Sequence, residues 1–158
     1  MSGVLKIVVF ALLAVAGLAV SACGGDDERK AKNDYVRQVN AAQAEFAQTV
    51  TTVSQRITNK SSSSQDRKTL QQFQKAIDDV VTDLRDIKVP DTVKSEHEQL
   101  VKAMSGFGAE IRKATLALRA PNTRTIEEAQ RTIQRATQTV NVRIDQAIAA
   151  INSKLGQK

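Results

Sequence analysis

Apolar residues downstream of position 35 recur every three or four positions, which is the spacing of one face of an α-helix. Four such series are separated by short polar or proline-containing segments. They predict helices over about residues 28–58, 66–88, 91–119 and 123–155. Because short connections favour antiparallel neighbours, we expect an all-α protein with an antiparallel up-down four-helix bundle over residues 36–158.

The expected core is the seam on which these four series face one another. The first helix contributes Val36, Val39, Phe46, Val50, Val53 and Ile57, and the second Leu70, Phe73, Ile77, Val80, Leu84 and Ile87. The third contributes Val93, His97, Leu100, Met104, Phe107, Ile111, Ala114 and Leu118, and the fourth Ile126, Ala129, Ile133, Val140, Ile144, Ile148, Ile151 and Leu155. Gln43 fills the one vacant position of the first series.

The connections are marked by residues that oppose helix formation. Residues 59–65 include four consecutive serines, Val89-Pro90 follows the second helix, and Ala120-Pro121-Asn122 follows the third. Helix-capping pairs are expected at Ser63 with Asp66 and at Thr125 with Glu128. In an up-down bundle the start of the first helix, the Val89-Pro90 turn and the C-terminus then share one end.

The first 22 residues have a different pattern from the rest of the chain. Lys6 is their only charged residue, and an apolar run extends from Ile7 to Val20 before the small residues Ser21 and Ala22. This layout is typical of a secretory signal peptide. The run is shorter than the roughly 20 apolar residues that a membrane-spanning helix needs. Residues 1–22 are therefore predicted to be a cleaved signal.

The sequence Val20-Ser21-Ala22-Cys23 is an aliphatic residue, two small residues and a cysteine. It resembles the lipobox of bacterial lipoproteins, with valine where leucine is commoner. The resemblance implies that the Cys23 thiol receives a diacylglyceryl group and that Cys23 becomes the lipid-anchored N-terminus. Residues 23–35 would then be a linker and polar stalk. Cys23 is the only cysteine, so an unmodified exported thiol, the alternative, would be unpaired.

Composition narrows the choice of partners. The formal net charge of +6 and the pI near 9.7 would suggest nucleic acid in a cytoplasmic protein. An exported chain does not meet that partner, and aromatic residues make up only 3% of the sequence. We therefore expect the membrane, through Cys23, and another envelope protein as partners, and no nucleic acid.

The sequence offers little catalytic chemistry. Glu96-His97-Glu98 invites a metal site, but His97 is the only histidine, and adjacent helical residues do not share a face. Carboxylate-bridged di-metal bundles need two Glu-x-x-His pairs, which this chain lacks. It also lacks a Gly-x-Ser-x-Gly turn. We predict no enzyme, no metal and no cofactor.

Gly106-Phe107-Gly108 lies in the middle of the third helix, where each glycine costs about 1 kcal/mol relative to alanine. One interpretation is a close helix approach beside Phe107, and the other is a notch that opens a small apolar pocket. His97, Gly106, Phe107 and Gly108 are therefore the candidate ligand or partner contacts.

These features favour a membrane-tethered interaction or structural module of the cell envelope. The alternative is a carrier or sensor that holds a small apolar ligand between helices. The Val89-Pro90 turn before a helix that bears His97 also resembles small, uncharacterised helical-bundle lipoproteins of bacteria. That resemblance implies the bundle fold and assigns no activity.

Overall fold

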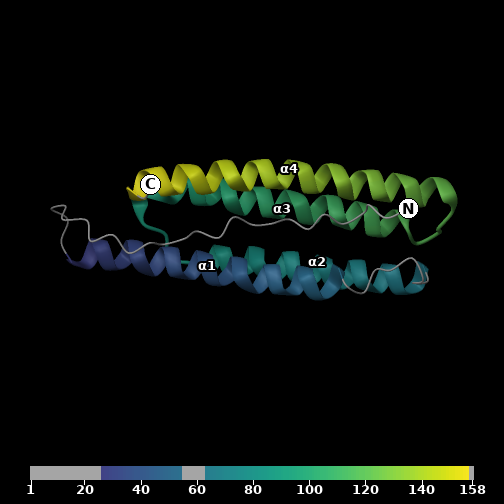
Figure 1. The fold of residues 1–158 in the computed structure, drawn as a ribbon, viewed down its shortest axis with the longest axis horizontal. Helices are drawn as coiled ribbons and strands as arrows, with labels where there is room; N and C mark the ends of the chain where they lie inside the picture. The colour runs from purple at the N-terminus through teal and green to yellow at the C-terminus, as the bar shows by residue number, and fades with distance from the viewer. Residues whose placement is uncertain (1–25, 55–62, 157–158) are drawn as a thin grey trace.

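Four long helices form most of the structure, a computed structural model that describes residues 26–54 and 63–156 (Figure 1). They are α1 (Asp26–Ser54), α2 (Ser63–Asp86), α3 (Lys94–Ala117) and α4 (Thr123–Leu155), with a short 3-10 helix, η1 (Asp91–Val93), before α3. Consecutive helices pack against each other and alternate in direction. This arrangement confirms the predicted all-α, up-down bundle.

Some sequence predictions fall on parts of the chain outside this description. They are the signal peptide 1–22, the lipidation site Cys23, the core position Ile57, and the side chains of Val50, Val53, Ser63 and Asp66. Within the described helices, none combines the length and hydropathy needed to cross a membrane.

One end of the bundle gathers three parts of the chain that are distant in sequence. The start of α1, the connection from α2 to α3 and the end of α4 lie together there, as predicted (Figure 1). At the connection, Pro90 has φ −61° and ψ 141°, an extended conformation that ends one helix and precedes the next. We call this the proximal end. Because α4 has 33 residues, the bundle is roughly 50 Å long.

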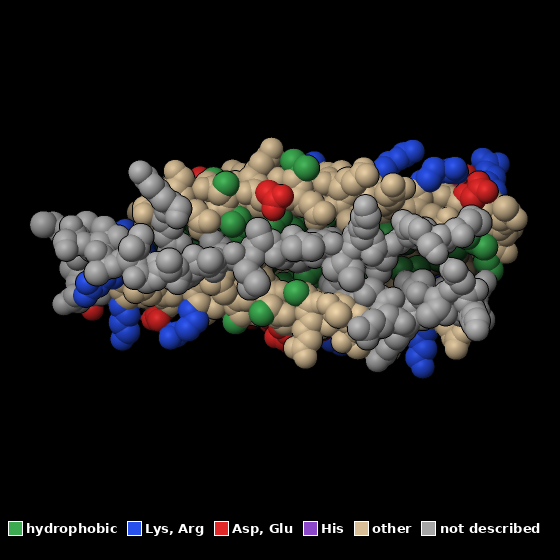
Figure 2. Space-filling model, in the orientation of Figure 1, with side chains coloured by type: hydrophobic (Ala, Val, Ile, Leu, Met, Phe, Trp, Pro, Cys, Tyr) green, Lys and Arg blue, Asp and Glu red, His purple; other side chains and the backbone are tan. Residues whose placement is uncertain are grey.

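The core follows the predicted seam along the whole bundle. The buried members of that seam are Val36, Val39, Phe46, Leu70, Ile77, Val80, Leu84, Ile87, Val93, His97, Leu100, Met104, Phe107, Ile111, Ala114, Ala129, Val140, Ile144, Ile148 and Ile151. Figure 2 shows hydrophobic side chains between the two layers of helices, with lysine and arginine side chains projecting along the outer edges of that face. The amphipathic pattern therefore predicted the packed face of each helix.

The start of α4 corrects two predictions. Asn122, and not Thr125, is the capping residue: its Oδ1 accepts from the Thr125 backbone N–H at 3.0 Å, and Thr125 Oγ1 accepts from the Asn122 N–H at 2.9 Å. Glu128 instead pairs with Arg124. Ile126 therefore lies in the first turn, where it is 36% exposed, and its predicted place in the core is wrong.

Tyr35 corrects the predicted boundary between stalk and bundle. It was included in the polar stalk, yet it is only 1% exposed and belongs to the core. A buried tyrosine requires a hydrogen-bond partner for its hydroxyl group, and a residue from another helix provides it. Because that partner is distant in sequence, the spacing of apolar residues could not identify it.

Gln43 is the polar exception within the seam of α1. Its side chain is 6% exposed, and neither its Nε2 nor its Oε1 has a hydrogen-bond partner among the described residues. Burying a polar group without a partner costs about 1–3 kcal/mol. The residue therefore lowers the stability of the bundle at this layer.

We expect Gln43→Met to raise the free energy of unfolding by about 1 kcal/mol, because the volume is nearly kept and the unpaired amide is removed. Urea unfolding of the two proteins measures the difference. Gln48→Met is the control, since Gln48 is exposed on the same helix. A loss of stability in Gln43→Met would show that the amide has a binding partner.

Candidate functional site

The imidazole of His97 connects three helices at the proximal end. It is 4% exposed and projects from the first turns of α3. Its Nε2 lies 2.8 Å from the carbonyl oxygen of Leu84 in α2, and its Nδ1 lies 3.2 Å from the hydroxyl oxygen of Tyr35 in α1. The two rings meet edge to face, with centroids 5.6 Å apart. Both ring nitrogens therefore have a partner within the protein.

These partners determine the neutral tautomer of the ring. A carbonyl oxygen can only accept, so the hydrogen must reside on Nε2. Nδ1 of the neutral ring is then an acceptor, and the Tyr35 hydroxyl donates to it. Burial, and secondarily the charge of Glu96, raises the pKa of Tyr35, which keeps its hydroxyl protonated.

Burial also lowers the pKa of His97 below its ordinary value of 6.5, because the charged ring would lose its hydration. The hydrogen bond to Leu84 and the charge of Glu98 oppose this shift without cancelling it. The spacing of apolar residues predicted that His97 lies on the buried seam, which is confirmed. It did not identify Tyr35 or Leu84 as partners.

Glu96 connects the same end to α4. It is 9% exposed, and its Oε1 lies 2.9 Å from Nζ of Lys154. The hydrogen bond from Lys154 lowers the pKa of Glu96, so the carboxylate is charged. The other oxygen, Oε2, is buried and has no hydrogen-bond partner among the described residues. We call Tyr35, Leu84, Glu96, His97 and Lys154 the proximal polar cluster.

This cluster does not have the composition of a metal site. Within residues 26–54 and 63–156, no group of three or more histidine, cysteine, aspartate and glutamate side chains could hold a metal ion. Glu96 and Glu98 do not converge on His97, because Glu96 pairs with Lys154 and Glu98 is exposed. The contacts of the cluster join all four helices.

We expect the stability of the protein to fall between pH 7 and pH 5. The unfolded chain takes up a proton near pH 6.5, whereas the folded chain resists protonation of His97, so acid favours unfolding. Stability from this residue is thus present above pH 6.5 and is lost as the pH falls toward the folded pKa. Urea unfolding at the two pH values measures the loss.

His97→Leu should flatten this dependence, since the variant has no histidine at all. Because the chain has one histidine, its ring resonances also report the folded pKa directly in an NMR titration. A titration midpoint at or above 6.5, or an equal acid loss in both proteins, would contradict the assignment.

The second candidate group, Gly106-Phe107-Gly108, lies along α3 roughly 15 Å from His97 and does not meet it. Phe107 is 4% exposed, and its ring packs edge to face on Phe73, with centroids 5.8 Å apart. Phe73 in turn stacks on Phe46 at 6.2 Å, so one aromatic group spans α1, α2 and α3. An aromatic side chain therefore packs directly against Phe107 in the interior.

The two glycines have different surroundings. A Cβ at Gly108 would lie 3.1 Å from Cγ2 of Ile77, a fully buried residue of α2, so the absence of a side chain permits close approach of α2 and α3. A Cβ at Gly106 would meet nothing within 4 Å. The close-approach interpretation therefore applies to Gly108 and not to Gly106.

Alanine at each position tests this difference. We expect Gly106→Ala to raise the free energy of unfolding by about 1 kcal/mol, because alanine loses less backbone entropy in a helix. Gly108→Ala should raise the free energy of unfolding by less, or lower it, because the Ile77 side chain must move. Thermal unfolding of both variants measures the contrast, and equal stabilisation would mean that the α2–α3 contact is loose.

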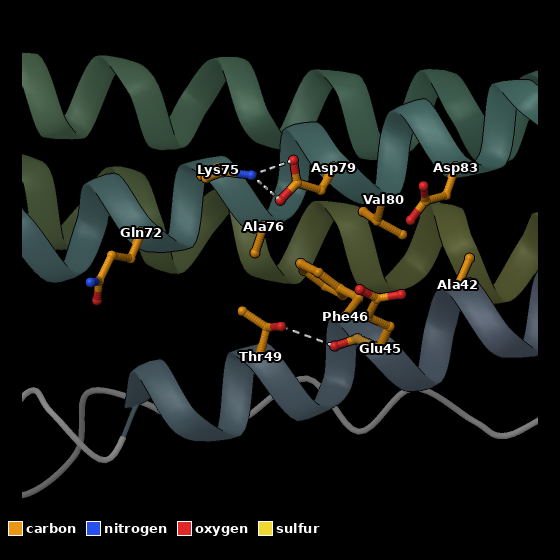
Figure 3. A pocket seen from close by; sticks show the side chains of 10 residues that line it. All are labelled: Ala42, Glu45, Phe46, Thr49, Gln72, Lys75, Ala76, Asp79, Val80 and Asp83. Atoms are coloured by element: carbon orange, nitrogen blue, oxygen red, sulfur yellow. Dashed lines mark hydrogen bonds and ion pairs between the residues drawn. The ribbon is translucent and has the colours of Figure 1, made fainter.

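Among the hollows on the surface of the described bundle are two that residues 106–108 do not line. The first, about 160 Å³, lies between α1 and α2 (Figure 3). Its lining residues are Ala42, Glu45, Phe46, Thr49, Gln72, Lys75, Ala76, Asp79, Val80 and Asp83. The second, between α2 and α3, is lined by Asp78, Val81, Arg85, Ser105, Ala109, Arg112, Lys113 and Leu116. The salt bridge between Arg112 and Asp78, at 3.5 Å, links its two helices. Sequence reasoning identified neither hollow, because each combines residues of two helices.

Comparisons with known proteins assign no family. No family model, no curated protein and no solved structure matches the chain. The residues and their geometry are therefore the basis on which a function is proposed.

Proposed function

We propose that this chain is a bacterial lipoprotein, anchored outside the cytoplasm through lipid on Cys23, whose helical bundle is an interaction or structural module of the cell envelope. The observation that carries the proposal is the sequence Val20-Ser21-Ala22-Cys23 after a signal-like apolar run. Two acyl chains on one cysteine anchor a protein stably, since each buried CH₂ contributes about 0.8 kcal/mol.

The position of the first helix supports this proposal. α1 begins at Asp26, three residues beyond Cys23, so little chain separates the lipid from the bundle. The proximal end, with the α2–α3 connection and the end of α4, then faces the membrane (Figure 1). A bundle standing upright would hold its opposite end roughly 50 Å from the lipid surface.

A binding role fits the described residues better than catalysis. The titratable groups of the proximal polar cluster have partners within the protein: His97 contacts Tyr35 and the backbone carbonyl of Leu84, and Glu96 pairs with Lys154. The carrier alternative needs space beside Phe107, but Phe73 packs on that ring and Gly108 abuts Ile77. These close contacts around Phe107 favour the interaction module.

We expect Cys23→Ala to abolish membrane anchoring and to leave the bundle folded, because Cys23 precedes α1 and the core. Partitioning between detergent-rich and aqueous phases measures the anchoring, and circular dichroism of the same sample measures the fold. Retention of the variant in the detergent-rich phase would contradict the proposal, because it would show an anchor other than the lipid on Cys23.

A further inference from the structure

The hollow between α1 and α2 has an apolar floor and an acidic rim. Ala42 and Phe46 from α1 and Ala76 and Val80 from α2 form the floor, and each is 9% exposed or less. An alanine lies toward each end of this groove, Ala42 near Asp83 and Ala76 near Lys75, and these small side chains leave a depression that larger ones would have filled (Figure 3). Figure 3 shows Phe46 rising from α1 toward α2 and Val80 descending toward α1.

The rim carries a local charge opposite to that of the whole protein. The charged residues that line it are Glu45, Asp79, Asp83 and one cation, Lys75, so three carboxylates against one ammonium give a net charge of −2. Lys75 Nζ lies 2.6 Å from Asp79 Oδ2 and neutralises that carboxylate. Glu45 and Asp83 form no ion pair within the described part of the chain. The 158 residues of the sequence together carry a net charge of +6.

We propose that this groove docks a basic amphipathic helix of a partner protein, an inference that rests on the proposed role as an interaction module. A volume of about 160 Å³ accommodates one large apolar side chain or the aliphatic stem of a lysine or arginine. Glu45 and Asp83 then pair with cationic groups at the edges. Helix-in-groove recognition combines such an apolar anchor with side chains three or four residues away.

The position of the groove favours a protein over the lipid surface. Ala42 lies roughly 24 Å along α1 from Asp26, on the flank of the bundle. That distance exceeds the Debye length of about 8–10 Å at physiological salt, so charges of a membrane at the proximal end are screened there. The carboxylates would also be repelled by anionic lipid. A polypeptide that approaches from the side can reach the groove.

The test uses the processed, lipid-anchored protein in nanodiscs of zwitterionic lipid and a labelled helical peptide of leucine, alanine and lysine. A peptide with glutamate in place of lysine is the charge control. Fluorescence anisotropy measures binding to the wild type and to the double variant Glu45→Gln/Asp83→Asn. The matched control is Glu127→Gln/Asp145→Asn, which removes two carboxylates from α4, outside the groove.

We expect the basic peptide alone to bind, the groove variant to weaken binding roughly tenfold, and the α4 variant to leave it unchanged. Equal weakening by the two double variants, or no binding by the wild type, would overturn the assignment. Light scattering measures self-association. If the wild type self-associates and the groove variant does not, a second copy of this chain occupies the groove, and the proposal of a separate partner protein is overturned. Membrane anchoring in the same preparation is measured by flotation, so a failed anchor and a failed groove are distinguished.

Discussion

The hydrogen bonds of one buried imidazole determine how three of the four helices meet. A buried polar group without a partner costs about 1–3 kcal/mol, so α1, α2 and α3 must be placed where Tyr35, Leu84 and His97 satisfy one another. The ion pair between Glu96 and Lys154 adds α4 at the same level. Apolar side chains alone tolerate sliding along a seam, whereas these directional contacts fix the register.

Away from this end, packing depends on the sizes of side chains. The rings of Phe46, Phe73 and Phe107 occupy the space between three helices, and Gly108 lets α2 approach α3 against Ile77. Gln43 interrupts this apolar packing with an unpaired amide. The bundle is thus held by specific polar contacts at its proximal end and by the fit of apolar side chains along its length.

Polar contacts at the proximal end and apolar packing along the rest of the bundle agree with the proposed role. A protein anchored beside its first helix needs a rigid proximal end, and the polar cluster joins all four helices there. Its flank remains available for partners, because the groove between α1 and α2 involves none of the cluster residues. The surfaces proposed for anchoring and for binding are therefore separate.

Local pattern was sufficient to predict four helices and their buried faces, because helical hydrogen bonds form between nearby residues. The lipobox is also a local pattern, and it stays a prediction. His97 was also expected on the seam. Its partners were not, since Leu84 and Tyr35 lie 13 and 62 residues away. Thr125 was predicted to cap α4, whereas in the folded chain Asn122 is the capping residue. The groove combines side chains of α1 and α2, which meet only in the folded chain. Periodicity specifies which face of a helix is buried, whereas the packing of helices specifies which residues meet across it.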